Sequence, residues 1–209
     1  MKQFFVVFLA GGWLLWSACG SPVNPPNTAP DADSLARKDS MSNAFFPVGD
    51  YLMTEILHVD SLPVAIVRYT TQKGRTDSAF ISPAEFNNLA KQFLVTEFRD
   101  GSFQKKYRES SFMDKTTQSV TFTYSTPDRD LPLQRVDVLA APGPAHNGTN
   151  QVKSIYLEKT FTSGDTLVLQ KMFWKADRNF QIITRTNVHG KPLADKQVKV
   201  VWDNGEGEE

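Results

Sequence analysis

One pair of residues in the chain has the spacing of a metal-binding site. Glu55 and His58 stand three positions apart, so a single helix face would carry both a carboxylate and an imidazole. A dinuclear centre in a helix bundle needs this pair twice, and the sequence contains it once. The other two histidines, His146 and His189, lie beside turn-forming residues, where histidine is ordinary surface chemistry. We therefore expect no metal ion and no other cofactor.

The sequence motifs of common catalytic sites are absent. The chain contains no Gly-x-Ser-x-Gly, no His-Glu-x-x-His and no glycine-rich phosphate loop. Folding can assemble a catalytic triad from residues at any spacing, so this absence lowers the expectation of an enzyme without excluding one. No catalytic residue is predicted from the sequence.

The N-terminal sequence is typical of an export signal. Met1 and Lys2 form a short positive region, and an apolar run follows over residues 4–15. This run is shorter than the ~20 apolar residues that a membrane-spanning helix needs. Two small residues then directly precede Cys19, which is the only cysteine of the chain.

This arrangement resembles the lipobox of bacterial lipoproteins, with Trp16 where the family usually has an aliphatic residue. The resemblance implies that residues 1–18 are removed as a signal peptide and that Cys19 becomes a lipidated N-terminus, which attaches the protein to a membrane. Gly20, with no acidic run behind it, resembles the lipoproteins of Bacteroidota that face the periplasm from the outer membrane. A plain secretory signal cleaved near Ala18, or an uncleaved hydrophobic anchor, is the alternative.

Residues 19–43 are rich in proline and poor in large apolar side chains. This composition favours extended conformers and cannot bury enough surface to fold, which predicts a tether. Within it, Asp33-Ser34-Leu35 and Asp39-Ser40-Met41 resemble the O-glycosylation sites of Bacteroidota, so Ser34 and Ser40 are candidate glycosylation sites. Residues 204–209 are expected to be a disordered tail.

The charge balance excludes some partners. Lys and Arg together number 23, as do Asp and Glu, so no overall field favours nucleic acid, and we expect none to bind. With one cysteine there is no disulfide within the chain. A modest basic cluster would contact anionic lipid or polysaccharide, or else form a solvated face. It comprises Arg99, Lys105, Lys106 and Arg108, around Phe103 and Tyr107.

Residues 44–203 have the periodicity of a single domain that begins with helices and a hairpin. Apolar spacing predicts a helix over 49–60, and residues 64–71 and 76–81 predict a hairpin around a turn at 72–74. Ser82, Pro83 and Glu85 form a capping box, and an apolar stripe from Phe86 to Leu94 predicts a helix that covers a sheet. Residues 95–113 are expected to be a connector with some helix.

Six further strands are predicted over 118–125, 133–140, 152–161, 166–174, 180–186 and 197–202. Because most of the connections are short, an antiparallel meander is expected, with one long exposed loop over 141–150. Together with the hairpin and two helices on one face, these strands predict an α+β fold. The alternative is a β-sandwich or open barrel with peripheral helices.

Met172, Phe173 and Trp174 are consecutive, so one strand carries large apolar side chains on both faces. Either both faces are buried or one carries an exposed binding patch, for which Trp174 and Trp202 are the candidates. Packing in the core is the alternative for both tryptophans.

An anchor, a tether and a strand-rich domain without catalytic motifs favour a non-enzymatic binding or assembly module. Its sheet, or an edge strand, would accept another protein of the cell envelope. A hydrolase of envelope polymers is one alternative, and it would need two carboxylates about 5–10 Å apart in a cleft. A carrier of lipid or small molecules is another, and it would need an apolar cavity of ~300 Å³ or more.

Overall fold

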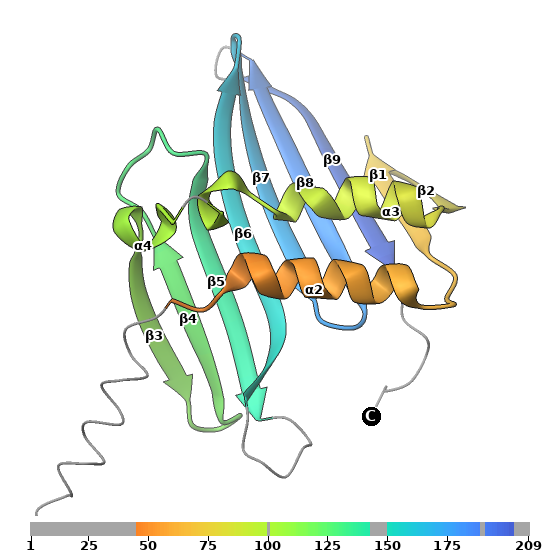
Figure 1. Ribbon diagram of the computed structural model, residues 1–209. Helices are drawn as coiled ribbons and strands as arrows, with labels where there is room; N and C mark the ends of the chain where they lie inside the picture. Colours follow the sequence, from red (N-terminus) through yellow and green to blue (C-terminus); the bar gives the residue numbers. More distant parts are fainter. Residues whose placement is uncertain (1–44, 100, 143–149, 189–190, 203–209) are drawn as a thin grey trace, which may run out of the picture. The chain divides into compact units, whose positions relative to one another are not determined.

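The computed structural model describes residues 45–99, 101–142, 150–188 and 191–202. All strands in this part belong to one nine-stranded open antiparallel sheet, in the order β2-β1-β9-β8-β7-β6-β5-β4-β3 (Figure 1). The strands are β1 Val67–Gln72, β2 Arg75–Phe80, β3 Arg108–Asp114, β4 Ser119–Ser125, β5 Leu133–Pro142, β6 Asn150–Ser163, β7 Thr166–Lys175, β8 Asn179–Val188 and β9 Lys191–Val201. A single open sheet with a few helices is compatible with the predicted α+β class.

The helices are α2 Val48–Ser61, α3 Pro83–Ala90 and α4 Phe103–Lys106, with short 3₁₀ segments η1 Lys91–Phe93 and η2 Thr96–Phe98. The expected helix over 49–60 is confirmed as α2. The expected cap is also present, because the Ser82 hydroxyl accepts a hydrogen bond of 3.2 Å from the Glu85 amide at the start of α3. The apolar stripe continues past the end of α3 through η1, where Phe93 is fully buried.

The predicted N-terminal hairpin is confirmed as β1 and β2. Lys73 and Gly74 both adopt positive φ angles, 52° and 73°, as a two-residue turn between right-twisted strands requires. This hairpin is part of the main sheet, since β1 pairs antiparallel with β9, with Val67 opposite Val201. The first and last strands of the domain are therefore neighbours.

Two predictions about strands were wrong: β3 was not predicted as a strand, and β9 begins earlier than predicted. β3 lies in the segment that was expected to be a connector, so the meander from β3 to β9 has seven strands and not six. β3 is an edge strand with almost wholly exposed side chains, and it therefore carries no apolar alternation. β9 begins at Lys191, well before residue 197, and its Pro192 pairs only with Asn187 of β8, beyond the reach of β1.

Helices α2 and α3 both lie across one face of the sheet (Figure 1). Beneath them, aromatic rings from α3, η1, β7, β8 and the residue after β9 form a continuous cluster with ring centroids 5.3–6.0 Å apart. The cluster comprises Phe86, Phe93, Trp174, Phe180 and Trp202, and all five side chains are fully buried. Arg68 of β1 and Glu85 of α3 form an ion pair beside this cluster. Side chains therefore fill the space between α3 and the sheet, where a carrier would need a cavity.

Candidate functional site

The side of the sheet that faces away from α2 and α3 is called here the helix-free face. Strand register places one row of residues directly opposite one another across this face, from edge to edge. The row comprises Ser110, Thr123, Asp137, Tyr156, Phe173, Gln181, Lys199, Tyr69 and Ser78. Their sequence neighbours on β5, β6, β7 and β8 point to the opposite side and form the core, because side chains alternate along a strand.

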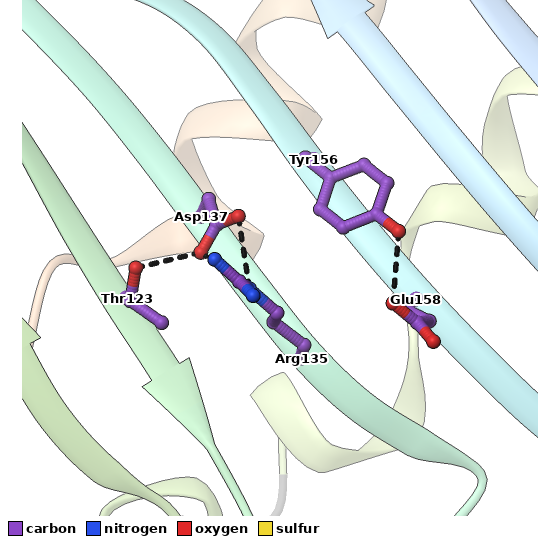
Figure 2. Close-up of polar contacts among 5 residues, drawn as sticks. All are labelled: Thr123, Arg135, Asp137, Tyr156 and Glu158. Atoms are coloured by element: carbon purple, nitrogen blue, oxygen red, sulfur yellow. Dashed lines mark hydrogen bonds and ion pairs between the residues drawn. The ribbon is translucent and has the colours of Figure 1, made fainter.

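Asp137 is the centre of a polar cluster on this face (Figure 2). Its Oδ1 accepts a hydrogen bond of 2.7 Å from the Thr123 hydroxyl on β4. The Arg135 guanidinium on β5 donates through Nε to both carboxylate oxygens, at 2.9 and 3.0 Å. Hydrogen bonding to Asp137 is the main reason that the pKa of Arg135 is raised. The Asp137 carboxylate is thus neutralised and held by two strands.

Tyr156 and Glu158 form a second polar pair on β6, next to the first (Figure 2). The Tyr156 hydroxyl donates a hydrogen bond of 2.9 Å to Glu158 Oε2. Burial of the ring raises the pKa of Tyr156, and the hydrogen bond to Glu158 raises it further. Glu158 stands opposite Arg135 on one side and Lys171 on the other. The phenol therefore stays protonated at neutral pH and acts as a donor, not as a base or nucleophile.

An aromatic pair continues the row beyond Tyr156. The rings of Tyr156 and Phe173 have centroids 4.8 Å apart, and Phe173 is 42% exposed. Tyr69, in the same row on β1, is exposed to a similar degree. The face thus combines aromatic surface with hydrogen-bonding groups that the fold already orients, a combination suited to binding.

Asp137 and Glu158, the carboxylates of the polar cluster, do not have the setting that hydrolysis requires. Asp137 is paired with Arg135, and Glu158 accepts a hydrogen bond from the Tyr156 hydroxyl. Neither Asp137 nor Glu158 lines any of four surface pockets of the described residues, one of which lies on the helix-free face beside β1 and β9. Glycoside hydrolysis needs one carboxyl group as the acid and a second as a free base or nucleophile, whereas both of these carboxylates already have hydrogen-bonded partners.

The predicted patch residues Trp174 and Trp202 both lie in the core and are 0% and 1% exposed. The prediction of an exposed patch at these two residues was therefore wrong, and the alternative that both pack in the core is confirmed. The exposed aromatic residue of β7 is Phe173, which points to the helix-free face. The consecutive large side chains of this strand therefore divide between a buried face and a partly exposed one.

The other predicted residues lie apart from this face or outside the described residues. Glu55 points into the domain, where its carboxylate accepts from Trp174, while His58 is exposed in the last turn of α2. Cys19, Ser34, Ser40, His146 and His189 lie outside the described residues. Within the described ranges, no group of three His, Cys, Asp or Glu side chains could hold a metal ion. No helix in those ranges has the length and apolar character to cross a membrane.

The basic cluster is divided by the fold. Phe103 and Tyr107 are buried, and Phe103 packs edge-on against Phe45 and Phe98. The four basic side chains around them remain exposed. The aromatic residues of this segment therefore belong to the core, and only its charges face solvent.

Sequence reasoning did not identify Asp137, Arg135, Tyr156 and Glu158 as a group. The available signal was alternation, since Arg135 and Asp137 interrupt an apolar strand at every second position, as do Tyr156 and Glu158. Their contacts across strands depend on register, and a β-bulge between Leu133 and Arg135 shifts that register by one residue. No protein-family model, curated protein sequence or solved structure matches the chain, so this geometry is the basis for assigning a role to the domain.

Proposed function

We propose that the protein is a non-enzymatic binding module of the cell envelope, attached to the outer membrane through lipidated Cys19 and facing the periplasm. In this proposal the proline-rich residues 19–43 are the tether, and the helix-free face of the sheet receives another envelope protein. The N-terminal resemblance to lipoproteins supports the anchor, and the chemistry of the helix-free face supports binding.

One observation carries the binding proposal: five of the eight exposed large apolar side chains among the described residues lie on the helix-free face. Tyr69, Phe80, Phe112, Leu167 and Phe173 all belong to it by strand register. Phe80 and Phe112 stand at opposite edges of the sheet and are 78% and 70% exposed. Exposed apolar groups that gather on one surface, with charged and polar groups between them, mark protein interaction sites.

The polar groups on the same face favour a protein partner with a defined orientation. Asp137, Arg135 and the Tyr156–Glu158 pair are held by hydrogen bonds before any partner arrives. Groups that are already ordered lose less conformational entropy on binding, so they add specificity at lower cost. The apolar side chains would supply most of the affinity, and the paired charges would set the orientation.

The binding proposal is tested by cross-linking in the native envelope, followed by purification. A Tyr69→Ser/Phe173→Ser variant removes apolar surface from the helix-free face. The matched control is Met53→Ser/Leu57→Ser, which removes exposed apolar side chains from α2 on the other side of the sheet. A partner recovered in stoichiometric amount with the wild type and the control, and lost with the face variant, is the expected result. Equal recovery with both variants would contradict the proposed face.

The anchor is tested separately by the intact mass of protein purified from its native membrane. A chain that starts at Cys19 and carries diacylglycerol and acyl groups is expected. The Cys19→Ala variant should lose this mass and leave the membrane fraction. A soluble wild-type chain cleaved near Ala18 with a free thiol would overturn the anchor.

A further inference from the structure

A lysine-lined pocket lies beside the start of β5, apart from the row that contains Tyr156. It has a volume of about 510 Å³ and lies between the segment of η1 and η2, the end of α4, and the start of β5 beside β6. Its polar lining includes Lys91 from η1, Glu97 from η2, Lys106 from α4 and Lys159 from β6. Strand register places Lys159 opposite Leu133 and Gln170, on the same side of the sheet as buried Leu157. The pocket is therefore on the helix-covered side.

The three ammonium groups form no ion pair within the described residues. No hydrogen bond or salt bridge joins Lys91, Lys106 or Lys159 to a described carboxylate. Glu97 is the one acidic side chain in the lining, and its Oε1 accepts a hydrogen bond of 3.4 Å from the Leu133 amide. Three lysines against one glutamate leave a formal charge of +2 on the pocket.

Lys159 is the least solvated of these lysines. Its side chain is half-buried, whereas Lys91 and Lys106 are exposed. Burial lowers the pKa of Lys159, and the nearby charge of Glu97 opposes this effect. A half-buried cation without a bonded counter-ion is unfavourable unless an anion accompanies it.

We propose that this pocket binds a phosphomonoester. At neutral pH a phosphomonoester carries a charge of about −1.5 to −2 and three acceptor oxygens, which matches the surplus charge and the three ammonium donors. Lysine is a common phosphate ligand because its ammonium is a compact point charge with three donors. The apolar lining beside the lysines includes Leu131 and Pro132, which would contact the organic part of the ligand.

The pH dependence of binding follows from the groups that face the pocket. Binding should strengthen as pH rises through the second phosphate pKa of about 6, because the dianion forms there. It should weaken at alkaline pH as Lys159 loses its proton, earlier than an ordinary lysine would, since burial lowers its pKa. The other charged groups that line the pocket are Lys91, Lys106 and Glu97. A Lys159→Arg variant, which stays charged, should lose the alkaline decrease.

Calorimetric titration of the full chain in detergent with glycerol 3-phosphate tests the proposal. Lys159→Met should weaken binding by about tenfold or more, the usual effect of losing a hydrogen bond to a charged group. Lys153→Met is the matched control, because Lys153 is an exposed lysine of the same strand and does not line the pocket. Its affinity should equal that of the wild type. Lys91→Met/Lys106→Met, on the exposed side, provides a second test should Lys159→Met fail to fold.

Phosphatidic acid in nanodiscs, beside free glycerol 3-phosphate, distinguishes a lipid headgroup from a soluble ligand with the same phosphate chemistry. Tighter binding of either probe supports the proposal and identifies the source. Binding of succinate as tight as that of the phosphate, no heat with either phosphate probe, or full affinity in Lys159→Met would overturn it. Because the helix-free face is on the other side of the sheet, none of these outcomes bears on the partner-binding proposal.

Discussion

Trp174 Nε1 donates a hydrogen bond of 3.3 Å to Glu55 Oε2, which connects the middle strand β7 to helix α2 across 119 residues of sequence. Trp174 is fully buried, so Glu55 provides an acceptor that its indole N–H cannot obtain from water. The charge of Glu55 also contributes, after burial, to the raised pKa of Tyr51 one turn earlier. A residue that resembles half of a metal pair in the sequence is therefore a structural acceptor in the fold.

Replacing this acceptor should destabilise the domain. Glu55→Ala leaves the buried indole N–H of Trp174 without this partner, and the free energy of unfolding should fall by about 1–3 kcal/mol. Glu55→Gln keeps an amide oxygen at the same place and should lose much less. Urea unfolding followed by tryptophan fluorescence measures both. Equal stability of the alanine and glutamine variants would show that the hydrogen bond is unimportant.

Gly49 should not tolerate a side chain, although it lies in a helix. A Cβ at this position would be 2.9 Å from the Cβ of Phe98, an atom fixed to the backbone of η2. Gly→Ala in a helix interior usually stabilises by about 1 kcal/mol, but here η2 would have to move. We expect Gly49→Ala to destabilise by about 1–3 kcal/mol in thermal and urea unfolding. A raised melting temperature would contradict this close approach.

The N-cap of α3 should contribute measurably to stability. Ser82→Ala removes the acceptor of the Glu85 amide and should lower the free energy of unfolding by about 1 kcal/mol. Ser82→Asp retains an acceptor at the N-cap and serves as the control. Denaturant titration of the three proteins distinguishes the cap from a general effect of mutation, because only the alanine variant should lose stability.

Asp114 should make stability depend on pH in the acid range. The Thr116 amide donates to its carboxylate at 2.8 Å, and the Thr117 hydroxyl donates at 3.0 Å, which lowers the pKa of Asp114. Because the folded-state pKa is depressed, the stabilisation is present above the ordinary aspartate pKa of about 3.9. It is lost as pH falls through the lower folded value.

An NMR titration of the Asp114 carboxyl measures this pKa directly. The expected result is a midpoint below that of an unstructured aspartate, with the shift reduced by Thr116→Pro, which removes the amide donor but leaves the Thr117 hydroxyl. The Asp114→Asn variant should show a flatter dependence of stability on pH in the same range. A normal midpoint in the folded protein would contradict the two hydrogen bonds.

Local signals in the sequence were enough to predict several elements. Ser82, Pro83 and Glu85 determine the start of α3 because a helix cap is made by residues within one turn. Gln72-Lys73-Gly74 predicted the first hairpin, since the turn conformation depends on the residues in it. The spacing of Leu52, Ile56 and Val59 predicted the buried stripe of α2. In each case the interacting residues are close in sequence.

The tertiary structure decided what depends on contacts between distant segments. β3 is a strand because it pairs with β4, while its own exposed residues carry no alternating pattern. Trp174 is buried and Phe173 is partly exposed, and only the helices packed on one face distinguish two adjacent aromatic residues. Cross-strand register likewise brings Thr123 to Asp137, and folding brings Lys91 and Lys159 to one pocket. Composition and periodicity determine which residues can face outward, but register and helix packing determine which of them meet.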